Sequence, residues 1–317
     1  MIWIISAGAL SIITIFFLDR LIRSFRVSNY WDKYVMITGC SSGFGEALAR
    51  HLDNLGFNVF AGCRSAQAME ALSKNSSGRL VPIHIDVREN QSIESALAEV
   101  KRILPEGRGL WGLVNNAGVL GIVGISEVLT REDFHKVFEV NLFGLIETTR
   151  HFLPLVRQAR GRVVNMSSIA GRIAFLSGAY GTSKFGVEAY SDLLRREMYH
   201  RGVKVCVLEP GGYKTSLSDF NNLTPYLVQL FDERATEEMK QCYGNVRKLY
   251  DKLIASQVQY VPNDISPVVE AYTHALTSSF PRTRYYVGKD ANFLRLISCM
   301  PTCLSDLILA LPSSSGA

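Results

Sequence analysis

The sequence predicts a doubly wound α/β fold of the Rossmann type, a single domain whose parallel sheet carries helices on both faces. First, short apolar runs alternate along the chain with longer stretches of helical pattern. Second, a glycine-rich loop directly follows the first apolar run of the domain. Third, 317 residues, of which 47% are hydrophobic, suffice for one domain with a large core.

The elements of this fold can be placed in order along the chain. Seven apolar runs are the candidate strands: Tyr34–Thr38, Asn58–Gly62, Leu80–Ile85, Leu110–Asn115, Arg162–Met166, Lys204–Leu208 and Tyr285–Gly288. Helical stretches between them include Glu89–Leu104, Arg131–Arg157 and Tyr180–Arg201. Strands separated by helices of this length imply right-handed crossovers and a parallel sheet. The ligand crevice should lie at the carboxyl ends of the strands.

The loop from Thr38 to Gly45 predicts a dinucleotide-binding turn. Gly39 permits the tight turn, Gly43 lets the backbone approach a pyrophosphate, and Gly45 lets the following helix pack against the strand. Free amides at the helix start would bind the phosphates. An ordinary turn is the alternative for such a loop taken alone. The expected contacts are Gly39, Ser41, Ser42, Gly43, Phe44 and Gly45.

Tyr180 and Lys184 are four residues apart and share one face of a predicted helix. A phenol titrates near about 10 in water, and a nearby ammonium lowers that pKa. We therefore expect Tyr180 to exchange protons near neutrality. A solvated helix face is the alternative for this pair taken alone.

With further motifs, these residues resemble the short-chain dehydrogenase/reductase family. The motifs follow the family order and spacing over about residues 30 to 290: the glycine loop, Asp86-Val87, Asn115-Asn116-Ala117-Gly118, Asn141, Ser168, Tyr180-x-x-x-Lys184 and Pro210-Gly211. Within the family, segments such as 110–118, 140–144 and 280–284 resemble the microsomal retinol dehydrogenases and the related 17-beta and 3-alpha hydroxysteroid dehydrogenases. The resemblance implies an NAD(P)-dependent oxidoreductase acting on CH–OH groups.

The resemblance also implies a role for each catalytic residue. Tyr180 is the acid or base for the substrate oxygen, and Lys184 lowers its pKa and bonds the nicotinamide ribose. Ser168 orients the alcohol or carbonyl, with Ser167 as the alternative. Asn141 holds a water that links Lys184 to solvent.

Further cofactor contacts are carried over in the same way. The implied residues are Asp86 and Val87 at the adenine, Asn115, Ala117 and Gly118 near the ribose, and Pro210, Gly211 and Thr215 around the nicotinamide. Backbone bracing is the alternative for the Asn115 turn.

Cofactor choice depends on the end of the second strand, where an acidic residue favours NAD and a basic one accommodates the 2'-phosphate of NADP. Cys63 occupies the acidic position, and Arg64 follows it. Related retinol dehydrogenases resemble an NAD pattern, with Asp where this chain has Ser41. We therefore expect NADP(H), with NAD(H) as the alternative and a solvated Arg64 as the non-functional explanation.

Residues 1–18 are uncharged and mostly apolar, and they predict a membrane anchor followed by a basic linker, residues 19–30. Eighteen helical residues rise about 27 Å against a hydrocarbon core of about 30 Å. A monotopic segment or a cleaved signal peptide is the alternative. Arg20, Arg23 and Arg26 follow the apolar stretch and favour a cytoplasmic catalytic domain. The family branch implies the endoplasmic reticulum membrane.

The catalytic domain is expected over residues 31–290, with a substrate-covering segment at about 213–260. Apolar residues make that segment amphipathic: Tyr213, Leu217, Phe220, Leu223, Tyr226, Leu227, Leu230 and Phe231. A lipophilic retinoid or steroid suits it, retinol or retinal first and a hydroxysteroid second, although an ordinary packed helix pair is the alternative. The hydrophobic segment 291–317 is expected to be an interfacial helix or a pocket wall, with a second span as the alternative.

Charge and composition limit the other partners. The net charge of +5 comes from scattered Lys and Arg residues, which disfavours nucleic acid and suits anionic membrane lipid. Six cysteines suggest reduced thiols, and no metal is expected. A homodimer is the commonest assembly. A noncatalytic nucleotide-binding membrane scaffold is the remote alternative.

Four glycosylation sequons bear on topology, because glycans would report a luminal domain. They lie at Asn75, Asn90, Asn165 and Asn222, and Asn165 is expected to be buried beside Ser168.

Overall fold

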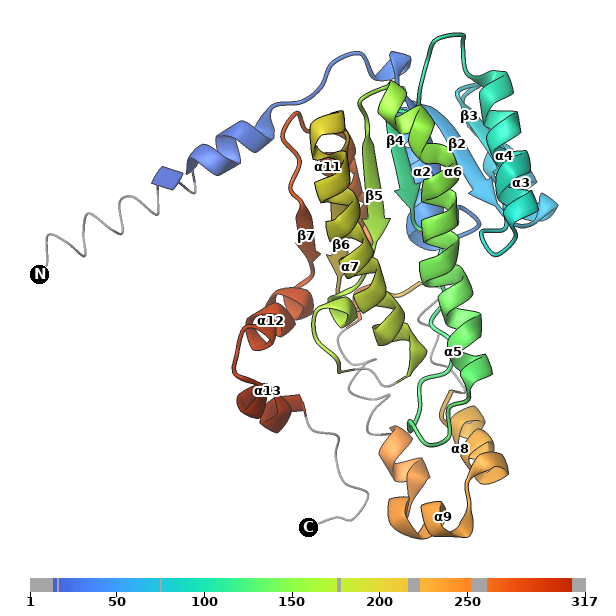
Figure 1. Cartoon of the computed structure of the whole chain (residues 1–317), viewed down its shortest axis with the longest axis vertical. Helices are drawn as coiled ribbons and strands as arrows, with labels where there is room; N and C mark the ends of the chain where they lie inside the picture. The colour runs from blue at the N-terminus through green and yellow to red at the C-terminus, as the bar shows by residue number, and fades with distance from the viewer. Residues whose placement is uncertain are drawn as a thin grey trace, which may run out of the picture.

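The computed structural model describes residues 14–15, 17–74, 76–175, 178–215, 223–251 and 261–309. Within these residues the centre is a seven-stranded parallel sheet of order β3-β2-β1-β4-β5-β6-β7 (Figure 1). The strands are β1 (Tyr34–Ile37), β2 (Asn58–Cys63), β3 (Leu80–His84), β4 (Gly112–Asn115), β5 (Arg162–Met166), β6 (Lys204–Pro210) and β7 (Arg284–Val287). The predicted fold class is confirmed, and each predicted strand is present within a few residues of its expected bounds.

Helices cover both faces of the sheet. One face packs against α2 (Gly43–Asn54), α3 (Ala66–Ser73) and α11 (Ser266–Thr277), and the other against α4 (Asn90–Ile103), α6 (Gly144–Gln158) and α7 (Ala179–Met198). The other helices are α5 (Arg131–Phe138), α8 (Leu223–Arg234), α9 (Glu237–Tyr243), α12 (Lys289–Ser298) and α13 (Thr302–Leu309). Short turns complete the order: η1 (Tyr30–Asp32), η2 (Glu139–Phe143), η3 (Ile169–Gly171) and η4 (Tyr199–Arg201).

The continuous apolar run of β1 follows from this layering. Val35 and Ile37 pack on one face of the sheet while Met36 packs on the other, and all three are fully buried. Side chains of a strand alternate between faces, so a strand covered on both sides must be apolar at every position. Strand order reverses between β1 and β4, which places the ligand crevice outside their carboxyl ends.

The helix predicted over Arg131–Arg157 is interrupted. A π-helical turn, η2, separates α5 from α6 and contains Asn141. Sequence periodicity does not reveal such turns, which occur frequently at functional sites. Gly144 follows immediately, and a Cβ there would lie 2.7 Å from the carbonyl oxygen of Val87, so only glycine permits this approach to the end of β3.

The segment before the domain is hydrogen-bonded to it. The amide of Val27 donates to the carbonyl of Thr277 at 2.7 Å, and the Ser278 hydroxyl donates to the carbonyl of Arg23 at 3.0 Å. Asp19 pairs with Arg282 at 3.2 Å. Residues 19–27 therefore lie along the end of α11 and the loop after it.

No helix within the described residues is long and apolar enough to cross a membrane. Residues 1–13 and 16, most of the predicted anchor, lie outside the described part of the chain.

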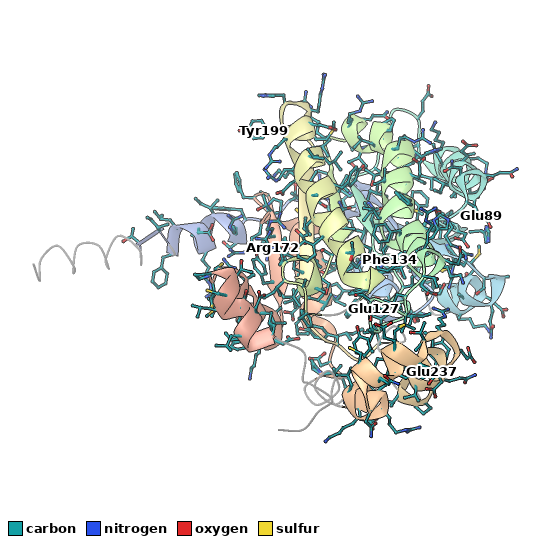
Figure 2. The ribbon with its side chains drawn as sticks, turned by 60° about the horizontal axis from the view of Figure 1, so that its bottom comes forward. Glu89, Glu127, Phe134, Arg172, Tyr199 and Glu237 are labelled. Atoms are coloured by element: carbon teal, nitrogen blue, oxygen red, sulfur yellow. The ribbon has the colours of Figure 1, made fainter. Side chains whose placement is uncertain are left out.

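The described part of segment 213–260, in which Glu237 is labelled in Figure 2, forms a small core of its own. Leu227, Leu230 and Phe231 on α8 are buried against Val128 and Tyr250, while Tyr226 is exposed. This packing matches the helix-pair alternative for those three side chains. Leu217 and Phe220 lie outside the described residues, as do 252–260.

Candidate active site

The structure gathers most of the predicted site residues at the carboxyl ends of the central strands. The glycine loop follows β1, residues 115–118 end and follow β4, Ser168 follows β5, and Pro210 ends β6. Tyr180 and Lys184 enter from the first turns of α7, and Asn141 enters from η2. Parallel strands bring these separate segments to one edge of the sheet.

The glycine loop has the geometry expected of a phosphate cradle. Gly39 and Gly43 have φ values of 72° and 64°, in the left-handed region that favours glycine. A Cβ at Gly45 would lie 2.3 Å from the carbonyl oxygen of Gly39, so glycine is needed for the helix to pack against the turn. The Ser42 side chain does not cap α2, which leaves first-turn amides to bind phosphate. The loop therefore fits a dinucleotide.

Sequence reasoning missed the polar brace beneath this loop. The Thr38 hydroxyl accepts hydrogen bonds from the amides of Asn116 and Ala117, both at 3.1 Å. The Asn116 side chain donates to the carbonyls of Thr38 and Gly39, and Tyr272 on α11 donates to Asn116 Oδ1 at 3.1 Å. Asn116 stands in the quoted motif, but nothing in the sequence pairs it with Tyr272, which is 156 positions away.

The two neighbouring serines face different partners. The Ser168 hydroxyl lies 3.5 Å from the carbonyl oxygen of Pro210, and it is close enough to the Tyr180 phenol to lower that group's pKa. Ser167 instead directs its hydroxyl toward the backbone carbonyl of Lys184 at 3.5 Å. The contact with Tyr180 supports Ser168 as the serine of the site, as the motif frame suggested.

The expected lowering of the Tyr180 pKa is not found. Burial raises the pKa of Tyr180, and the nearby Ser168 hydroxyl opposes that rise. The ammonium of Lys184 lies 5.6 Å from the centre of the Tyr180 ring and donates to the carbonyl of Met166 at 2.9 Å. Burial lowers the pKa of Lys184 itself to about 8. Helical spacing places the two side chains on one face but does not determine which partner the ammonium takes.

Asn141 is held by the chain after β4. Its side-chain oxygen accepts from the Val119 amide at 2.8 Å, and its amide group donates to the Val119 carbonyl and to Ser183. A Cβ at Gly118 would lie 3.4 Å from Asn141 Oδ1 and 3.8 Å from Lys184 Nζ. The absence of a side chain at Gly118 keeps the volume beside both polar groups free.

The Asn115 side chain braces the sheet. Its amide group donates to Thr149 and to Asn165, and Asn165 in turn donates to Ser191 on α7. Asn115 and Asn165 are both buried, so a cofactor contact by Asn115 would involve its backbone. The prediction that Asn165 is buried is confirmed, which makes its sequon inaccessible in the folded chain. Asn90 is exposed at the start of α4, whereas Asn75 and Asn222 lie outside the described residues.

The adenosine side of the crevice is basic. The side chain and backbone amide of Arg88 hydrogen-bond the Asp86 carboxylate, and Arg88 holds the pKa of that carboxyl below its usual range, with Arg64 adding to the effect. Arg64 is exposed directly after β2. Burial raises the pKa of the Cys63 thiol, and the nearby Ser41 hydroxyl opposes that rise. The end of β2 therefore carries no carboxylate.

The opposite side is closed by the turn after β6. Asp290, in the first turn of α12, accepts a 2.6 Å hydrogen bond from the Gly212 amide. A Cβ at Gly211 would lie 2.0 Å from that carboxylate, so Gly211 must be glycine. The Thr215 side chain lies 3.7 Å from the Cβ position of Gly43, which places Thr215 beside the glycine loop. Sequence reasoning did not anticipate Asp290.

A parallel sheet with a glycine loop at its switch point, and with Ser, Tyr and Lys beside it, defines a nicotinamide-dependent oxidoreductase. The short chain dehydrogenase family model matches residues 33–225, and the chain belongs to that family. Its members use NAD(P) and act on CH–OH groups.

Relatives match over almost the whole chain. Retinol dehydrogenase 7 of Rattus norvegicus is 48% identical, covering 92% of this chain and 93% of its own length. The 17-beta-hydroxysteroid dehydrogenase type 6 of Bos taurus is 44% identical, covering 91% and 92%. A solved short-chain dehydrogenase from Streptomyces avermitilis superposes with a TM-score of 0.66 at 29% identity, covering 83% of this chain and 91% of that one.

Proposed function

We propose that this protein is a membrane-bound oxidoreductase that transfers a hydride between a nicotinamide cofactor and a lipophilic alcohol or carbonyl, with retinol and retinal as the substrate pair. The observation that carries the proposal is the convergence of Ser168, which follows β5, with Tyr180 and Lys184 in the first turns of α7, beside the glycine loop at the carboxyl ends of the strands. The named relatives that match over most of the chain support the substrate class.

The chain's own groups handle the proton. Tyr180 gives its phenolic proton to the substrate oxygen in the reductive direction and takes one back in the oxidative direction. The Ser168 hydroxyl lowers the pKa of Tyr180, which favours the phenolate, and it would orient the substrate oxygen. Lys184, with a pKa of about 8, can release or accept a proton near neutrality, and Asn141 fixes the loop beside it. A nicotinamide cofactor, when bound, supplies or accepts the hydride.

A hydroxysteroid, at the 17-beta or 3-alpha position, is the second candidate substrate. The 44% identical bovine relative named as a 17-beta-hydroxysteroid dehydrogenase favours it. Purified protein in detergent should be given all-trans-retinal or a 17-ketosteroid with NADPH or NADH, and Tyr180→Phe serves as the inactive control. Product formed by wild type alone would support the reductase and identify the substrate. Bound cofactor without any turnover would instead support the noncatalytic scaffold.

NADP(H) is the proposed cofactor, since Cys63 replaces the acidic residue that would bind the ribose of NAD and Arg88 neutralises Asp86. Arg64→Leu should raise KM for NADPH much more than KM for NADH. Arg79→Leu is the matched control, because Arg79 is exposed just before β3, at the amino-terminal end of the strands, whereas Arg64 follows the carboxyl end of β2. Equal changes for both cofactors would refute the preference.

The proposed location is the endoplasmic reticulum membrane, with the catalytic domain on the cytoplasmic side. The uncharged residues 1–18 and the arginines after them support it. Protease added to sealed microsomes should digest the domain. Protection of the domain in sealed vesicles, with digestion after detergent, would place it in the lumen.

A further inference from the structure

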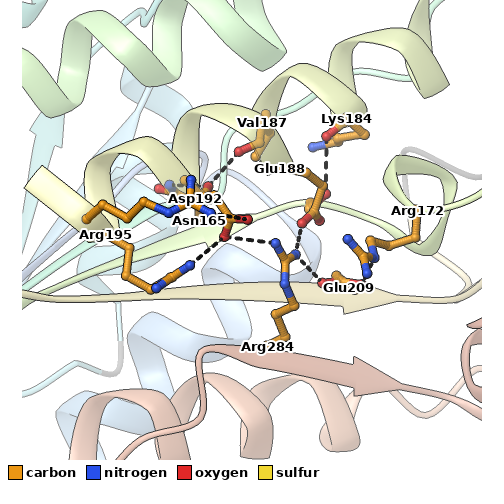
Figure 3. Close-up of polar contacts among 12 residues, drawn as sticks. Asn165, Arg172, Lys184, Val187, Glu188, Asp192, Arg195, Glu209 and Arg284 are labelled. Carbon is orange, nitrogen blue, oxygen red and sulfur yellow. Dashed lines mark hydrogen bonds and ion pairs between the residues drawn. The ribbon is translucent and has the colours of Figure 1, made fainter.

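A cluster of charged side chains on α7, β6 and β7 lies close to Lys184 (Figure 3). Arg284, at the start of β7, donates through Nη1 to Glu188 on α7 and, at 2.8 Å, to Glu209 on β6. Its Nη2 donates to Asp192 on α7 at 2.9 Å. Glu209 is fully buried and Glu188 nearly so. One guanidinium therefore joins three carboxylates on two elements.

Both elements continue directly into the active site. Glu188 lies one helical turn after Lys184 and two turns after Tyr180, on the same face of α7. Glu209 directly precedes Pro210, whose carbonyl oxygen lies 3.5 Å from the Ser168 hydroxyl. Arg284 thus links the helix that holds the proton-transferring phenol to the strand end that begins the Pro210-Gly211 turn.

A contribution to the stability of the fold does not explain why these charges are buried together. Buried ion pairs often contribute no more than apolar residues of similar volume, because desolvation offsets the attraction. Oε2 of Glu209 has no hydrogen-bond partner among the described residues and forms only a 3.7 Å ion pair with Arg172 Nε. Burial raises the pKa of Glu209 to about 7, against the attraction of Arg172 and Arg295. The buried charges therefore cost folding free energy. What they provide in return is a fixed position of α7 relative to β6.

We infer that Arg284 is a positioning residue for hydride transfer: its bridge from Glu188 to Glu209 fixes the distance between Tyr180 on α7 and the Pro210-Gly211 turn. The inference rests on the proposed function. A misplacement of about 1 Å at a reacting centre costs roughly 100-fold in rate, so a looser link between α7 and β6 should appear in kcat.

The test separates charge balance from geometry. Arg284→Met combined with Glu188→Gln and Glu209→Gln removes these three charges at nearly constant volume and leaves Asp192 paired with Arg195. Arg284→Lys keeps the charge but cannot fork between two carboxylates. Arg282→Met is the matched control, because Arg282 is a half-exposed neighbour whose ion pair is with Asp19. Each protein is assayed for Tm, kcat and both KM values with the substrate that wild type turns over.

The triple variant should keep its Tm within a few degrees while kcat falls about tenfold or more, with KM values within about twofold. Arg284→Lys should show a smaller loss of the same kind, and Arg282→Met should behave as wild type. A folded triple variant with wild-type kcat would refute the inference, as would kcat losses that merely follow Tm. If the triple variant fails to fold, unchanged kcat in Arg284→Lys would refute it instead. An inactive wild type would refute the proposed function, which is a separate result.

Discussion

Replacing Lys184 with methionine should stabilise the fold while it abolishes turnover. Lys184 is 2% exposed, and burial lowers its pKa from the ordinary 10.5 to about 8. At about 1.4 kcal/mol per pKa unit, the charged ammonium costs the folded state about 3 kcal/mol at pH 7. Loss of the hydrogen bond to the Met166 carbonyl offsets about 1 kcal/mol of the gain. The free energy of unfolding should therefore rise by about 2 kcal/mol.

The stability difference between Lys184→Met and wild type should depend on pH. The unfolded chain holds the lysine proton up to about pH 10.5, and the folded chain holds it only up to about pH 8. Between these values the unfolded state binds more protons, so wild-type stability gains from this residue as pH rises. The advantage of Lys184→Met should thus shrink to less than about 1 kcal/mol at pH 9.5.

Urea unfolding at pH 7.0 and 9.5, on protein freed of cofactor, measures both values. Cofactor must be removed because a ligand of the native state adds its own stabilisation. Lys101→Met is the control, since Lys101 is exposed on α4 and should change little at either pH. The burial argument would be refuted if Lys184→Met were less stable than wild type at pH 7.0. It would also be refuted if the difference in the free energy of unfolding between the two proteins were the same at both pH values.

Three further outcomes are expected. Ser168→Ala should abolish turnover while Ser167→Ala retains it, measured as kcat with the identified substrate; the reverse result would transfer the role to Ser167. Tyr272→Phe should lower the free energy of unfolding by about 1 kcal/mol through loss of its hydrogen bond to Asn116, and should weaken cofactor binding in a titration. Protein expressed in cells with an endoplasmic reticulum should show no glycosidase-sensitive mass shift; a shift would place the domain in the lumen.

The sheet and the helices on its faces were predictable because the strands are rich in apolar residues and are separated by stretches of helical pattern. A strand covered on both faces, such as β1, is apolar at every interior position, whereas β5 also carries the buried polar residues Arg162 and Asn165. The π-helical turn at Asn141 was not predictable, because one extra residue in a turn leaves the surrounding helical periodicity intact.

The catalytic residues could be located from spacing, but their partners could not. Tyr180 and Lys184 are four positions apart on one helix, which fixes their shared face. The partner of the lysine, the Met166 carbonyl, comes from β5, and the Asp290 carboxylate at the Gly211 turn comes from α12. Such contacts depend on how distant elements pack, and local sequence carries no signal of them.

Residues 19–27, which precede the domain, are not a free linker. A free linker lets a domain sample a volume set by chain length, with a span that grows as the square root of the number of residues. Here Val27 and Arg23 are bonded to the end of α11, so the reach of the domain from residue 19 is set by fixed geometry. If the preceding residues enter a bilayer, the domain would meet the lipid surface in one orientation, and its crevice would open at one constant height above that surface.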